Sequence, residues 1–122
     1  MIQHAGLSPE RWRTFPLAQQ LIMVGNEMLR STKLCEPDDA GRRINSLERV
    51  LALVDLTIAV NDRAPLRREL LRWREVVAGL YVASEHDASA HRAALRALLL
   101  LTPESAKQAE FVAPWPAAVR GN

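Results

Sequence analysis

Four carboxylates stand among apolar residues, where a helical bundle can use them for metal chemistry. They are Glu27, Glu48, Asp55 and Glu69. In bundle proteins with a di-iron centre, carboxylates from several helices converge and Glu-x-x-His pairs complete the ligand set. The residues three positions after the glutamates are arginine, leucine and arginine. The sequence therefore predicts no metal site, and the two glutamate–arginine spacings predict intrahelical ion pairs instead.

The histidines and the cysteine are not accompanied by the partners that catalysis needs. His86 and His91 are five residues apart, which does not place them on one helical face, and we expect surface or capping histidines. Cys35 is the single cysteine and has no histidine or CxxC partner near it in the sequence. Glycine-rich phosphate loops and the common hydrolase and zinc-protease motifs do not occur. We therefore predict no catalytic residue, no cofactor and no enzymatic activity.

Asp55 lies inside an apolar run, between Val54 and Leu56. A carboxylate that is removed from water needs a charged or hydrogen-bonding partner. We therefore predict that Asp55 forms a buried ion pair with an arginine of the next helix or of a neighbouring subunit.

Arginines form the strongest electrostatic feature of the chain. Five lie within twelve residues and two more lie near the start of the preceding helix: Arg63, Arg67, Arg68, Arg72, Arg74, Arg42 and Arg43. Such a face can follow a phosphate backbone. Two glutamates lie in the same segment, however, and the net charge of the chain is only +2. Two interpretations stay open, a solvated face with salt bridges and a surface that binds RNA or DNA.

Apolar residues at spacings of three and four predict the helices that carry these groups. We expect an all-α fold, an antiparallel four-helix bundle with helices over about 17–31, 38–60, 65–83 and 88–101. Ser8 before Pro9 and Asp62 before Pro65 are expected to mark helix starts, and Pro16 either a second start or a kink. A short extra helical segment and an extended Pro-rich tail are expected over 102–122. The 122 residues are expected to form a single domain.

Two of these helical segments carry a second apolar stripe. Its members are Phe15, Ile22, Leu29, Leu53, Leu56 and Val60. A helix of an isolated bundle needs only one broad apolar face, so we predict that these residues form the interface of a homo-oligomer. The alternative is that the fourth helix and the segment 111–115 cover the stripes within one chain.

Hydropathy and cysteine content bear on the compartment. The sequence has no apolar run long enough to cross a membrane and begins without the apolar segment of a signal peptide. A single cysteine allows no intrachain disulfide framework, which fits a reducing compartment. We expect a cytoplasmic protein without membrane contacts.

Three segments within about residues 12–81 carry a family resemblance. They begin with Trp12-Arg13-Thr14-Phe15, Ser46-Leu47-Glu48-Arg49 and Arg68-Glu69-Leu70-Leu71. Together they resemble a family of short bacterial all-helical proteins with no established activity, which implies a bacterial bundle protein and no catalytic residues. A looser likeness, at the level of fold, is to helical accessory proteins that form rings and bind RNA.

The sequence therefore favours a non-enzymatic, self-associating scaffold or adaptor that binds another protein. The alternative function is an RNA- or DNA-binding accessory subunit that uses the arginine-rich helix face.

Overall fold

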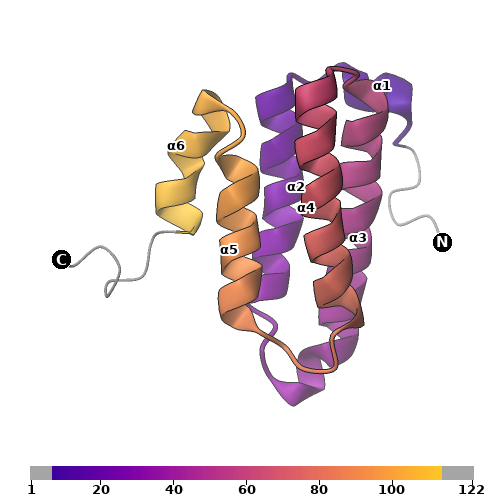
Figure 1. Cartoon of the computed structure of the whole chain (residues 1–122). Coiled ribbons are helices and arrows are strands. Elements are labelled where there is room, and N and C mark those ends of the chain that lie inside the picture. Colours follow the sequence, from indigo (N-terminus) through magenta and orange to yellow (C-terminus); the bar gives the residue numbers. More distant parts are fainter. Residues whose placement is uncertain (1–6, 114–122) are drawn as a thin grey trace.

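A computed structural model describes residues 7–113, which form six α-helices and one 3-10 helix. In chain order they are α1 (Pro9–Arg13), α2 (Leu17–Thr32), η1 (Pro37–Asp39), α3 (Ala40–Val60), α4 (Ala64–Val82), α5 (Ala88–Leu99) and α6 (Pro103–Val112). This range contains no strand, so the all-α prediction is confirmed. The four long helices α2 to α5 lie side by side (Figure 1). The predicted Pro-rich tail, from residue 114 onward, lies outside the described residues.

Proline and capping residues set several of the helix starts. Ser8 caps α1, with its hydroxyl accepting a hydrogen bond from the backbone N–H of Arg11 at 3.2 Å. Pro16 occupies the residue before α2. The prediction that Asp62 caps α4 is wrong, because Arg63 occupies the cap position and makes no side-chain capping bond.

The first short helix is fixed to the bundle by Trp12, which is fully buried. Its indole N–H donates to the hydroxyl of Thr57 on α3 at 2.9 Å. The amide of Gln20 donates to the carbonyls of Trp12 and Phe15, at 3.1 and 2.8 Å. Asn61 in turn donates to the Gln20 side-chain oxygen at 2.9 Å. These bonds satisfy the polar groups buried where α1, α2 and α3 meet.

A glycine allows α2 and α5 to pack closely. A Cβ atom on Gly25 would lie 3.2 Å from Cδ2 of Leu99 and 3.3 Å from Cδ1 of Leu95, which is tighter than ordinary van der Waals contact. Leu95 and Leu99 are both buried. The side of α2 that faces α5 is therefore filled at this point without room for a larger residue.

The last helix is tied to α5 by a buried arginine. Arg96 donates to the carbonyl of Ala113 at 2.9 Å and to the carboxylate of Glu110 at 2.8 Å. At the other end of α6, the hydroxyl of Ser105 donates to the carbonyl of Leu99 at 2.7 Å. Since α6 packs against both α2 and α5, it adds cover to the side of the bundle where α2 lies.

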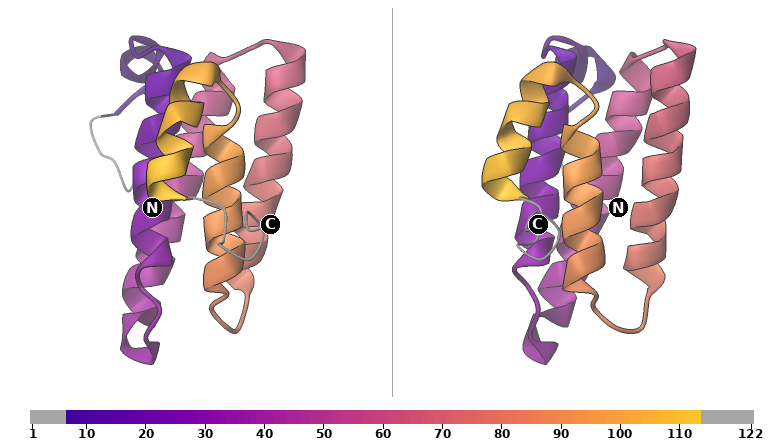
Figure 2. Two further views of the ribbon diagram at one scale, coloured as in Figure 1. Left: turned by 90° about the vertical axis from the view of Figure 1, so that its left-hand side faces the viewer. Right: turned by 60° about the vertical axis from the view of Figure 1, so that its left-hand side comes forward.

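Helix α4 contacts fewer elements than the other three long helices do. It packs against α3 and α5, and the indole N–H of Trp73 donates to the carbonyl of Ala94 on α5 at 2.7 Å. In the right-hand view of Figure 2, α4 forms the edge of the bundle, and no described helix lies on its far side. One long side of α4 is therefore left to solvent.

Candidate interaction surface

The second apolar stripes of α2 and α3 are packed inside their own chain. Leu53 is 3% exposed and belongs to the core, so its prediction as a surface interface residue is wrong. The other five lie partly buried against the core: Phe15, Ile22, Leu29, Leu56 and Val60. None of the six is among the large apolar residues that the described part of the chain exposes. The stripes are therefore not the exposed apolar surface from which self-association was predicted. Helices α1, α5 and α6 cover more of α2 and α3 than periodicity alone implies.

Asp55 forms the predicted ion pair with an arginine of the next helix. Its carboxylate is exposed, however, so the prediction that the pair is buried is wrong. Its partner is Arg74 on α4, whose Nε donates to a carboxylate oxygen at 2.6 Å. This hydrogen bond, helped by the charge of Asp55, raises the pKa of Arg74. The carboxylate is accommodated because it lies at the edge of the α3–α4 contact, where water reaches it.

The arginines of α4 do not form one free basic face. The guanidinium of Arg67 donates to the carbonyl of Ile58 near the end of α3 at 3.0 Å. Arg72 pairs with Glu69 at 3.0 Å, and Arg74 is held by the carboxylate described above. These three side chains already have protein partners, which reduces their availability to phosphate groups.

The other predicted basic residues divide in the same way. Arg42 pairs with Asp39, and Arg43 donates to the carbonyl of Leu34 at 2.6 Å. The side chains of Arg63 and Arg68 are exposed, and neither side chain forms a hydrogen bond or an ion pair with another residue within 7–113. Two arginines of the predicted nucleic-acid surface are thus without a protein partner in this range.

Glu27 and Glu48, the other two carboxylates considered for a metal site, have protein partners. Glu27 accepts from Arg49 on α3 at 2.8 Å and lies 3.5 Å from Arg30. Glu48 accepts from the hydroxyl of Tyr81 at 2.7 Å, which raises the pKa of that tyrosine. Within the described ranges, no group of three or more His, Cys, Asp or Glu side chains could hold a metal ion.

Two histidines meet between the loop before α5 and the end of α2. His91 is 2% exposed, and its Nδ1 lies 3.0 Å from the hydroxyl of Ser31. The ring of His86 packs edge to face against it, with centroids 4.5 Å apart. Burial, aided by the charges of His86 and Arg43, lowers the pKa of His91 to about 4. The expectation of a surface or capping histidine is wrong for His91, because its ring is buried against Ser31 of α2. His86 reaches this ring from the loop before α5, where helical spacing does not apply.

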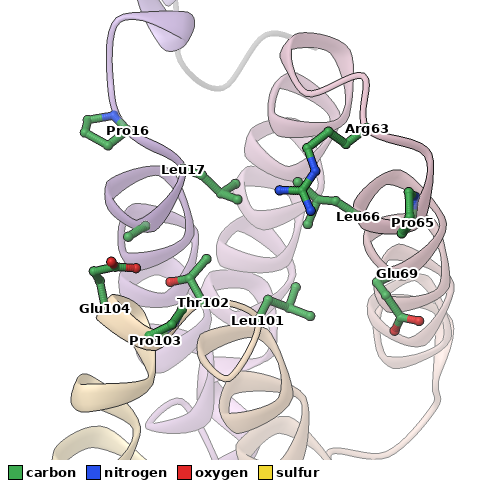
Figure 3. A pocket seen from close by; sticks show the side chains of 11 residues that line it. Pro16, Leu17, Arg63, Pro65, Leu66, Glu69, Leu101, Thr102, Pro103 and Glu104 are labelled. Atoms are coloured by element: carbon green, nitrogen blue, oxygen red, sulfur yellow. The ribbon is translucent and has the colours of Figure 1, made fainter.

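An open hollow of about 590 Å³ lies where α2, α4 and α6 begin (Figure 3). Pro16, Leu17, Leu66 and Leu101 give it apolar walls. Its polar lining has mixed charge, with one arginine, Arg63, and two glutamates. A surface of mixed charge has no strong preference for phosphate groups, because the carboxylates repel them.

The largest uncovered apolar residues of the long helices lie on α4. Leu71, Val76 and Val82 are 47%, 52% and 77% exposed. Leu71 and Val82 belong to a stripe whose spacings alternate between four and three residues, and we call it the outer stripe of α4: Ala64, Arg68, Leu71, Glu75, Ala78 and Val82. Its two charges and its two small alanines conceal the pattern in the sequence, which directs attention to the core stripe on the opposite side. The signal that could have revealed it is the repeat of apolar residues at 71 and 78 and again at 82.

No helix in the described part of the chain is long and apolar enough to cross a membrane. The chain matches no protein-family model, no curated protein and no solved structure at a significant level.

Proposed function

We propose that this chain is a non-enzymatic, self-associating scaffold or adaptor that binds another protein. Its architecture in this proposal is an antiparallel bundle of four main helices with α6 added to one side. The free, exposed thiol of Cys35 fits a protein of the cytoplasm, where thiols stay reduced.

The observation that carries the proposal is the uncovered outer stripe of α4. Leu71 and Val82 leave apolar surface in contact with water on a helix that has neighbours only on its other sides. An apolar helix face that no other element of the chain covers is a candidate surface for protein binding. The groups that could have supported catalysis are engaged instead, since Asp55 and Glu27 are held by arginines and His91 by Ser31.

Binding of RNA or DNA is the second candidate function. It is supported by Arg63 and Arg68, whose side chains are free to contact phosphate groups. Both are exposed at the start of α4. Two side chains per subunit give a weak footprint, since each phosphate contact adds only a modest and salt-dependent increment to affinity. The geometry favours protein binding over this alternative.

Light scattering on a size-exclusion column tests the two candidates together. The protein is purified without nuclease, and absorbance is recorded at 260 and 280 nm in low and high salt. The proposal expects a multiple of the chain mass with the absorbance ratio of pure protein. A monomer at every concentration contradicts self-association. Excess absorbance at 260 nm that disappears in high salt favours the nucleic-acid alternative.

A further inference from the structure

We infer that the segment after Ala113 crosses α5 of its own chain and places Trp115 in a small hollow between α4 and α5. This α4–α5 hollow has a volume of about 200 Å³ and is lined by Glu69, Arg72, Trp73, Val76, Ala97 and Leu101. None of these residues belongs to the outer stripe of α4. The inference therefore goes beyond the proposed self-association and does not depend on it.

The size and lining of the α4–α5 hollow fit one large apolar side chain. Its volume lies below the roughly 300 Å³ at which small-molecule sites begin. A helix, about 10 Å across, is too wide for it. Val76 in its wall is 52% exposed, and the charged residues of the lining, Arg72 and Glu69, already pair with each other at 3.0 Å. The hollow therefore favours an apolar occupant without charge.

The sequence after Ala113 has the composition that this hollow requires. Up to Arg120 it reads Pro-Trp-Pro-Ala-Ala-Val and carries no charge. A proline on each side of Trp115 disfavours a continued helix and favours an extended backbone. The backbone of Ala113 has already left the helical conformation, with φ −148° and ψ 60°. An extended segment that presents one indole is thus expected to depart from the axis of α6.

This segment begins beside α5. The guanidinium of Arg96 donates to the carbonyl of Ala113 at 2.9 Å, which holds the end of α6 against α5. Helix α5 lies between α6 and α4 (Figure 2), and Ala93 and Ala97 are exposed on it. Ala97 directly follows Arg96 and lines the α4–α5 hollow. The path from Ala113 to the hollow therefore crosses α5 where its side chains are short.

The length of the path favours this hollow over the larger one at the start of α6. Two residues span at most about 7 Å, and the indole of Trp115 extends beyond its backbone. This is enough to bring the indole past the small side chain of Ala97. The larger hollow is lined by Pro103, at the opposite end of α6. Since α6 has 10 residues, that hollow lies about 15 Å away along the helix.

Fluorine nuclear magnetic resonance of the full chain labelled with fluorotryptophan tests the inference. Trp115→Phe assigns the Trp115 signal, and circular dichroism confirms that each variant is folded. In the wild type, the shift of this signal between light and heavy water is expected to be less than half that of the unfolded chain. Val76→Glu and Ala97→Glu, both in the hollow, are expected to restore the full shift. Leu71→Glu, of nearly equal exposure but outside the hollow, is the matched control and should leave the signal unchanged.

The outcomes separate this inference from the proposed function. A wild-type Trp115 signal with the full solvent shift, or a protected signal that neither hollow variant changes, overturns the inference. If protection is lost on dilution in step with the molar mass from light scattering, Trp115 of a second copy fills the hollow and the assignment within one chain is wrong. A monomer with a protected Trp115 contradicts self-association and supports the inference.

Discussion

The outer sides of α2 and α4 differ, although each helix carries two apolar stripes. On α2, Ile22 and Leu29 are packed against the core, and α3, α5 and α6 all lie against the helix. On α4, which packs against α3 and α5, Leu71 and Val82 stay exposed. The number of neighbours, rather than the number of stripes, thus decides which apolar residues remain available to another chain.

A charge placed in each region should separate them most strongly. Leu53→Glu puts an unpaired carboxylate into the core of the α3 side and is expected to lower the free energy of unfolding by more than about 4 kcal/mol. Leu71→Glu, on the outer stripe of α4, is expected to change it by less than about 1 kcal/mol. Urea denaturation followed by circular dichroism measures both. Equal losses of unfolding free energy in the two variants would show that Leu53 and Leu71 are equally buried.

Acid should destabilise the α2–α5 contact through His91. Its pKa is about 4 in the folded chain and 6.5 when unperturbed, so the unfolded state takes up the proton first. Stability is therefore complete above pH 6.5 and falls as the pH is lowered toward 4, by up to about 3 kcal/mol. Burial lowers the pKa of His91 most, the charges of His86 and Arg43 lower it further, and Asp87 raises it. Denaturation curves at several pH values check this.

The matched variant for that experiment is His91→Gln, which keeps a polar group near Ser31 but does not titrate. It is expected to flatten the profile between pH 6.5 and 4. A variant profile parallel to that of the wild type would assign the acid sensitivity to other groups.

Two glycines offer a comparison with opposite signs. Gly79→Ala is expected to stabilise the chain by about 1 kcal/mol, because alanine favours the helix and the new methyl group meets open space. Gly25→Ala is expected to cost about 1 kcal/mol, because Leu95 and Leu99 must move within a filled core. Thermal unfolding of both variants decides, and a gain at both positions would mean that α2 and α5 are less tightly packed than described.

The smallest effect is expected at the ion pair between α3 and α4. Asp55→Asn should cost no more than about 1 kcal/mol, because an exposed pair is well screened by water. Glu69→Gln, which removes another exposed pair on α4, is a suitable control. Denaturation at low and high salt measures both changes, and a loss of several kcal/mol at Asp55 alone would indicate a desolvated pair.

Helix positions were largely predictable from the sequence because local chemistry sets them. The expected start of the first long helix at residue 17 follows from Pro16, and its observed end at Thr32 lies one residue beyond the expected one. The expected segment from 65 to 83 is displaced by one residue, since α4 spans Ala64–Val82. Periodicity, proline and capping residues act within a few positions, so they can be read without knowledge of the fold.

The surface and the polar contacts were less predictable because they depend on residues distant in sequence. The hydrogen bond from Trp12 to Thr57 spans 45 residues, and the contact between His91 and Ser31 spans 60. Exposure of Asp55 depends on how closely α4 approaches α3. Helical periodicity identifies which residues share a face but does not tell which face another helix will cover.

Nuclear magnetic resonance on a dilution series most directly tests the claim that α4, and not the stripes of α2 and α3, joins two copies. Backbone amide signals are followed in ¹H–¹⁵N spectra as the protein is diluted. We predict concentration-dependent shifts along the outer stripe of α4, with the signals of Ile22 and Leu56 unchanged. Shifts centred on Ile22 and Leu56, or no shifts at any concentration, would contradict it.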